Sequence, residues 1–185
     1  MTSSFTRLLS ALSFIAIIFS PIAQAVAPNA VIADGGMVAS RSAWASQVGA
    51  QILDQGGNAV DAAVAVGFAL AVTYPSAGNL AGGGFMVIHL NDGTVITNDH
   101  REKAPAASTK DMFLDSEGKV VKGLSTKSHL AVGVPGSVAG LLSVLEKYGT
   151  MDRAQVIQPA IDLAANGILL DRDLADAFAR RQPDF

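Results

Sequence analysis

The stretch NAVDAAVAVGFALAVT, residues 58–73, carries the strongest fold information in the sequence. Asn58 is a favourable helix N-cap, and Asp61, three positions later, can return the hydrogen bond in a capping box. Positions 59–72 are apolar almost all round, which is typical of a helix buried in a core. About fourteen residues rise only about 21 Å, too little to cross a bilayer, and Pro75 ends the helix. The stretch therefore predicts a central core helix.

A second helix is predicted just before it, over residues 38–53. Trp44, Val48 and Ile52 recur every fourth residue beside the small Ala45 and Gly49, and together they predict one buried face. The glycine pair at residues 56–57 ends this helix and separates it from the core helix.

Two more helices are predicted after residue 136. The first covers residues 138–148, with Ser137 as its N-cap and Gly149 at its end. Its predicted buried stripe consists of Val138, Leu141, Leu142 and Leu145. The second begins with a capping pair, Asp152 and Gln155; Pro159 is expected to kink it, and Asn166-Gly167 to end it.

A glycine-rich segment, GNLAGGG at residues 78–84, leads into a predicted β-hairpin. The apolar run 85–90, the turn residues Asn91-Asp92-Gly93 and the β-branched run from Thr94 fit two strands joined by a short turn. Three consecutive glycines indicate positive φ or the close approach of another backbone or a ligand. They match neither nucleotide-binding glycine pattern, and they precede a strand instead of opening a helix, which argues against phosphate binding.

A charged loop, NDHREK at residues 98–103, follows the second predicted strand. Arg101 offers a planar fork of donors that matches a carboxylate, and loops at strand ends often carry sites. Taken alone, the residue pattern favours a solvated loop with internal ion pairs. The spacing leaves both interpretations open.

Composition and charge exclude several classes of function. The 185 residues are 50% hydrophobic and carry a formal charge of −3, as expected for a globular chain without a basic surface for nucleic acid. There is no cysteine, so disulfides and thiolate chemistry are excluded. His89, His100 and His129 lack a zinc-site spacing, and Ser128 with His129 lacks a nucleophile elbow. We therefore predict no metal site and no serine nucleophile.

The first 25 residues predict a signal peptide. Arg7 precedes an apolar run at 8–19, Pro21 interrupts it, and Ala23-Gln24-Ala25 provides small residues for cleavage after Ala25. The apolar run is too short for a membrane anchor. We expect export to the periplasm or the extracellular space, with no membrane association after the signal is removed.

The chain resembles the opening of the γ-glutamyltranspeptidase large subunit. Four motifs occur in the same order: GNAVDAA at 57–63, GNLAGGGF at 78–85, REKAPA at 101–106 and VPG at 134–136. The resemblance implies an α+β fold, the N-terminal nucleophile hydrolase αββα sandwich, with only its N-terminal part present in residues 26–185. It also implies that Arg101 is a substrate-binding residue that holds the α-carboxylate of a γ-glutamyl group.

The family chemistry implied by the resemblance needs no metal or cofactor. A precursor cuts itself into a large and a small subunit, and the threonine that begins the small subunit becomes the nucleophile, with its own α-amino group as base. It takes the γ-glutamyl group from glutathione or a similar compound, and water or an amino acid accepts it. We expect no catalytic residue within this chain, because the family's threonine lies several hundred residues from its start. Alone, the chain is expected to be inactive.

Two alternatives remain open. A relative resembling cephalosporin acylase would share the fold and act on a different side chain. A non-catalytic secreted module would use the loops at 78–84 and 98–103 to bind a partner.

Overall fold

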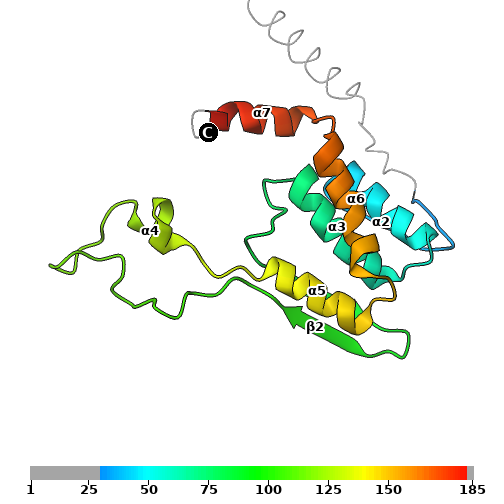
Figure 1. The fold of residues 1–185 in the computed structure, drawn as a ribbon, viewed down its shortest axis with the longest axis horizontal. Coiled ribbons are helices and arrows are strands. Elements are labelled where there is room, and N and C mark those ends of the chain that lie inside the picture. The colour runs from blue at the N-terminus through cyan, green and yellow to red at the C-terminus, as the bar shows by residue number, and fades with distance from the viewer. Residues whose placement is uncertain (1–29, 183–185) are drawn as a thin grey trace, which may run out of the picture. The chain divides into compact units, whose positions relative to one another are not determined.

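The computed structural model describes residues 30–182, and the chain from Ala33 onward forms one compact unit. The predicted signal peptide at residues 1–25 lies outside the described residues. The elements follow the order α2 (Ala43–Asp54), α3 (Ala59–Thr73), β1 (Phe85–His89), β2 (Val95–Asp99), α4 (Leu124–Lys127), η1 (His129–Ala131), α5 (Ser137–Tyr148), α6 (Arg153–Asn166) and α7 (Arg172–Arg181) (Figure 1).

Helix α3 is the central helix, as predicted. The Asn58–Asp61 capping box is present, and α3 packs against α2, α5 and α6 (Figure 1). Val64, Ala65 and Ala69 are fully buried. A helix in contact with neighbours on several sides needs apolar residues around most of its circumference, which explains its composition.

Helix α2 has the predicted buried face except at Trp44, and it differs from the prediction at its start. It begins at Ala43, because Ser42 is extended and its hydroxyl accepts a hydrogen bond from the Ala45 amide at 3.5 Å, as an N-cap does. The buried face consists of Ala45, Val48, Gly49 and Ile52, whereas Trp44 is 38% exposed. Trp44 is four residues before the buried Val48 and lines the same groove between α2 and α6, so it lies at the edge of the buried face and is only partly covered.

Helix α5 has a different N-cap from the one predicted, and its buried stripe agrees with the prediction except at Val138. Gly136 is the N-cap; Ser137 is the first helical residue, and its hydroxyl donates to Asn79 Oδ1. Leu141 and Leu145 are buried and Leu142 is partly buried, as predicted, whereas Val138 is 37% exposed. The other buried positions are Ser137, Gly140 and Val144. Gly140 faces inward because the His100 ring lies where a β-carbon would stand.

Helix α6 begins as predicted, with the Asp152 amide donating to Gln155 Oε1 at 3.2 Å. It ends at Asn166, and Gly167 with φ +78° forms the C-cap. Pro159 lies inside the helix, and the kink expected there stays a prediction.

The predicted hairpin is confirmed. Strands β1 and β2 pair antiparallel, with Phe85 opposite Asp99 and His89 opposite Val95. The face that carries Ile88 and Ile96 packs on the core, while Phe85, Val87 and Val95 are exposed on the other face. Within residues 30–182 this is the one named sheet, so the two sheets of the expected sandwich are not both found there.

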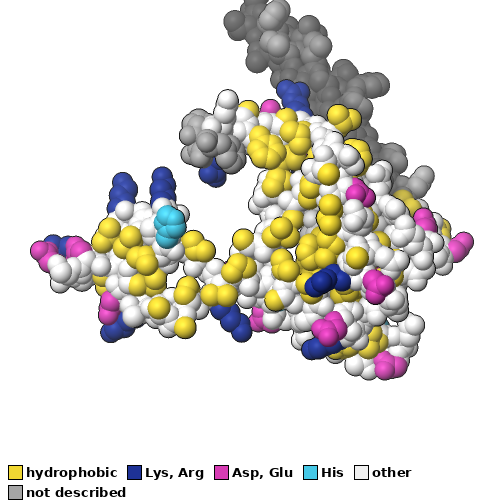
Figure 2. Space-filling view, viewed as in Figure 1, with side chains coloured by type: hydrophobic (Ala, Val, Ile, Leu, Met, Phe, Trp, Pro, Cys, Tyr) yellow, Lys and Arg dark blue, Asp and Glu magenta, His cyan; other side chains and the backbone are white. Residues whose placement is uncertain are grey.

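The segment between β2 and α5 contains α4 and η1 and contributes little to the core. Four of its apolar residues, Val120, Leu130, Val132 and Val134, are about half exposed or more. Figure 2 shows hydrophobic side chains gathered at the surface around α4. The core is instead formed by α2, α3, α5 and α6 together with the hairpin.

The glycine-rich segment packs closely against the charged loop. Glycines 82–84 have no positive φ, so close approach is their role. A β-carbon on Gly83 would clash with the Glu102 amide nitrogen, and one on Gly136 would clash with the His100 carbonyl oxygen. The Gly136 amide also donates to the Gly82 carbonyl at 2.7 Å. Three separate segments therefore lie side by side around residues 100–103.

The buried carboxylate of Asp61 joins the start of α3 to the α5–α6 connection. Asp61 is fully buried and accepts from the Asn58 amide at 2.8 Å, the Thr150 amide at 2.9 Å, the Thr150 hydroxyl at 2.7 Å and the Met151 amide at 3.2 Å. Burial raises the pKa of Asp61, but the hydrogen bonds from Thr150, Asn58 and Met151 outweigh it and lower the pKa overall.

Asp61→Asn is expected to lower the free energy of unfolding by about 2 to 4 kcal/mol, because an amide NH2 then faces backbone donors in a buried site. Denaturation in urea, followed by helical circular dichroism, measures the change. Asp54→Asn, at an exposed position near the end of α2, is the matched control and should change stability by less than about 0.5 kcal/mol.

The same carboxylate predicts a pH dependence. A lowered native pKa stabilises the fold above the unfolded value of about 3.9, and this contribution is lost as pH falls through the native pKa. The stability difference between the parent and Asp61→Asn should therefore shrink below about pH 4. A difference that stays constant down to pH 3 would contradict the assignment of a charged Asp61.

Gly83→Ala and Gly136→Ala are each expected to destabilise the protein by about 1 to 3 kcal/mol, because the added methyl group meets backbone atoms that cannot move independently. Gly35→Ala is the control, since nothing lies within 4 Å of the position that its β-carbon would take. Chemical denaturation of the three variants tests the comparison. Equal stability of all three would show that the close backbone contacts of Gly83 and Gly136 do not constrain the chain.

Candidate functional site

Arg101 lies two residues beyond β2, in the loop that the sequence singled out. Its side chain is 59% exposed, and its Nη2 atom is 3.0 Å from Glu102 Oε1. The guanidinium carbon lies 5.9 Å from the centre of the Phe85 ring. The ion pair that the solvated-loop interpretation expected is therefore present, yet most of the guanidinium edge remains open to a ligand.

The electrostatics of the pair keep both groups charged. The hydrogen bond to Glu102, together with its negative charge, raises the pKa of Arg101. The hydrogen bond from Arg101 is the largest cause that lowers the pKa of Glu102. An arginine has five N–H donors, so one partner leaves others able to bind a second carboxylate.

The backbone around Arg101 is fixed on both sides. The His100 amide donates to the Gly84 carbonyl at 3.0 Å, which extends the hairpin pairing by one position beyond the strands. On the other side, Lys103 and Val134 exchange backbone hydrogen bonds of 3.1 and 2.7 Å. The Arg101 amide itself donates to Asp99 Oδ1 at 3.1 Å. A residue held in this way presents its side chain in a defined direction, as a binding site requires.

A pocket of about 400 Å³ lies beside the loop. Its walls come from residues 98–101 and Lys103, from the connection that contains Val134 and Pro135, and from the first turns of α5. Arg101 and Lys103 both line it together with one acidic residue, Asp99, so cationic residues outnumber acidic ones around the cavity. This chemistry suits a small anionic ligand, in particular a carboxylate.

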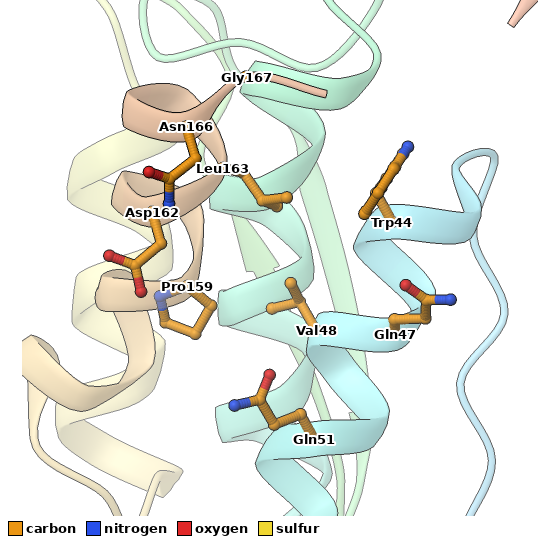
Figure 3. Close-up of a pocket in the computed structure, with 9 residues that line it drawn as sticks. All are labelled: Trp44, Gln47, Val48, Gln51, Pro159, Asp162, Leu163, Asn166 and Gly167. Atoms are coloured by element: carbon orange, nitrogen blue, oxygen red, sulfur yellow. The ribbon is translucent and has the colours of Figure 1, made fainter. Parts of the chain in front are cut away.

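A second groove lies between α2 and α6 and offers less chemistry (Figure 3). Figure 3 shows Val48, Pro159 and Leu163 between the helices, with the amides of Gln47 and Gln51 beside them. Its carboxylate, Asp162, accepts a hydrogen bond from Gln158 at 2.7 Å. We find neither a paired nucleophile nor a cation among the residues that line this groove.

The histidines and Ser128 have structural surroundings. His89 is in β1, His129 is in η1, and His100 Nδ1 lies 2.7 Å from Asn98 Oδ1. The Ser128 hydroxyl donates to the Leu124 carbonyl and accepts from the Leu130 amide. In the part of the chain that the structure describes, no three His, Asp or Glu side chains form a group that could hold a metal ion.

Two features near Arg101 were missed by the sequence reasoning. Phe85 was assigned to a strand but not to the site; its pairing with Asp99 places it on the same hairpin face as Arg101, and register-specific alternation could have indicated this. The Asn79–Ser137 hydrogen bond, which links the glycine-rich segment to α5, had no sequence pattern to reveal it.

Between residues 30 and 182, no helix combines the length and the apolar character needed to cross a bilayer.

Known proteins provide an independent comparison. The family model for gamma-glutamyltranspeptidase matches residues 45–185. The chain is 50% identical over 182 residues to a glutathione hydrolase proenzyme of Pseudomonas sp. (strain A14), covering 98% of the chain and 31% of the relative. It is 57% identical over 146 residues to the glutathione hydrolase proenzyme of Escherichia coli (strain K12), covering 79% of the chain and 25% of the relative.

The fold agrees with a solved structure. The crystal structure of Helicobacter pylori gamma-glutamyltranspeptidase is similar with a TM-score of 0.80 and 48% identity, over 84% of this chain and 44% of that one. The described residues therefore form a mixed α and β arrangement that matches part of such an enzyme. The chain spans between a quarter and a third of the length of these two curated relatives. With the matching family model and these identities, the chain belongs to the γ-glutamyltranspeptidase family.

Proposed function

We propose that this chain provides the part of a γ-glutamyltransferase or glutathione hydrolase that binds the α-carboxylate of a γ-glutamyl donor. The observation that carries the proposal is the exposed guanidinium of Arg101, held by Glu102 at the end of β2. Family membership supports it, since the two relatives compared above are named glutathione hydrolase proenzymes.

Arginine suits this role because its planar fork can donate two parallel hydrogen bonds to one carboxylate. Glu102 contacts Nη2, and the remaining donors are available to a substrate. Glu102 also offsets the charge of Arg101 when no substrate is bound. The substrate carboxylate would therefore be recognised by the planar geometry of the guanidinium donors as well as by its charge.

The remaining chemistry is proposed for the complete protein. A precursor would fold as the αββα sandwich and process itself into two subunits, and a threonine outside this chain would form the γ-glutamyl acyl-enzyme. Glutathione and related γ-glutamyl compounds are the proposed donors. The small subunit from the same precursor is the proposed partner, and the reaction uses no metal or cofactor.

Arg101→Lys in the complete, self-processed protein is expected to raise KM for a γ-glutamyl donor about tenfold or more, at about 1.4 kcal/mol per decade. The charge is kept but the planar fork is lost. Arg101→Ala should raise KM further, because the carboxylate is then left without its partner. Steady-state kinetics with γ-glutamyl-p-nitroanilide measures both effects.

The control is Arg153→Ala, at an exposed position on α6 away from this loop, which should leave KM unchanged. A donor analogue without the α-carboxylate adds a second comparison, since the Arg101 variants should lose most of the preference for the normal donor. An Arg101→Ala protein that matures normally and keeps both its KM and that preference would refute the assignment.

Export is also part of the proposal, based on the apolar run that ends at Pro21 and the Ala23-Gln24-Ala25 cleavage sequence. The mature protein should begin at Val26 in the periplasmic or extracellular fraction. N-terminal sequencing of protein from that fraction measures this directly. An exported protein that still begins at Met1 would contradict the cleavage site.

A further inference from the structure

Phe85 and Arg101 lie on the same face of the hairpin. Phe85 is opposite Asp99 in the register, and the pairing continues one step further through Gly84 and His100. Because side chains alternate between the two faces, Arg101 returns to the face of Asp99 and Phe85. The guanidinium carbon is 5.9 Å from the Phe85 ring centre, within the range of a cation–π contact.

Phe85 contributes little to the packing of the described core. Its side chain is 68% exposed, and it is absent from the cluster of buried and partly buried residues that forms that core. Its neighbour on the same face, Val87, is 71% exposed. The guanidinium is thus the specific partner that the structure gives to the ring.

Two neighbouring side chains, Glu102 and Phe85, contact the Arg101 guanidinium and can set its orientation. Glu102 holds one end of the guanidinium through Nη2, which leaves the group able to rotate about that contact. An aromatic ring against the guanidinium restricts this rotation, because the negative face of the ring attracts the cation. Glu102 and Phe85 together can therefore fix both the position and the plane of the group.

We propose that Phe85 is a positioning residue, whose ring orients the Arg101 guanidinium for the α-carboxylate of the donor. This inference rests on the proposed function of Arg101. A fixed plane reduces the side-chain ordering needed on binding, so the effect belongs to substrate affinity. Phe85 does not touch the reacting carbonyl in this proposal, so kcat should change little.

The test is steady-state kinetics of the complete, self-processed protein with γ-glutamyl-p-nitroanilide. Phe85→Leu keeps an apolar side chain and removes the π face; it should raise KM about fivefold, equivalent to about 1 kcal/mol at 1.4 kcal/mol per decade. Phe85→Tyr should retain the parental KM. Val87→Leu, on the same exposed face, is the matched control and should also retain it.

A fluorinated series separates electrostatics from shape. Replacing Phe85 by phenylalanine with one, two and three ring fluorines weakens the negative face of the ring stepwise with little change in size. The logarithm of KM should rise steadily along the series. This measurement remains decisive if Phe85→Leu fails to mature, since the fluorinated rings keep the packing.

The outcomes distinguish this inference from the proposed function. A rise in KM along the fluorinated series, smaller for the donor analogue without the α-carboxylate, supports Phe85 as a positioning residue. If Arg101→Lys raises KM but the fluorinated series does not, the Phe85 inference is wrong and the role of Arg101 stands. If neither changes KM, both fail.

Discussion

The buried carboxylate of Asp61 is the interaction on which the rest of the arrangement depends. It satisfies the N-terminus of α3 and, through Thr150 and Met151, binds the connection between α5 and α6. The Asn58 side chain adds a hydrogen bond from Nδ2 to the Tyr148 carbonyl at 2.8 Å. A buried charge is tolerated here because several donors surround it, and those donors come from segments almost ninety residues apart.

The hydrogen bonds of Asp61 affect the position of the candidate site through α5. Fixing the end of α5 against α3 also fixes Gly140, against which the His100 ring packs. His100 is paired with Gly84, so the hairpin and the loop after it take their position from the same helix. Arg101 is the next residue after His100 in the chain. The direction of its side chain is thus a consequence of packing between elements. Glu102 and Phe85 then contact the guanidinium itself.

The glycine-rich segment illustrates a constraint that is easily mistaken for a ligand loop. Its glycines have ordinary φ values, and what they permit is the passage of backbone against backbone. Gly83 lies against the backbone at Glu102, and Gly136 lies against it at His100. The GNLAGGGF and VPG motifs therefore pack against the REKAPA motif and restrict the backbone that carries Arg101.

The sequence by itself determined the elements whose cause is local. The capping box at Asn58, the turn at Asn91-Asp92-Gly93 and the helix start at Asp152 depend on residues within a few positions of each other, and all are found in the structure. The motifs around Arg101 likewise indicated the family.

Tertiary structure decided which faces are buried and which side chains meet. Trp44 and Val138 are apolar and have helical spacing, yet both are more than a third exposed, because the positions of neighbouring elements decide which side chains are covered. Ser137 binds Asn79 instead of capping α5, and Phe85 meets Arg101 through strand register. Such contacts join residues that are far apart in the chain. The conformational preferences of neighbouring residues do not indicate which distant residues will meet.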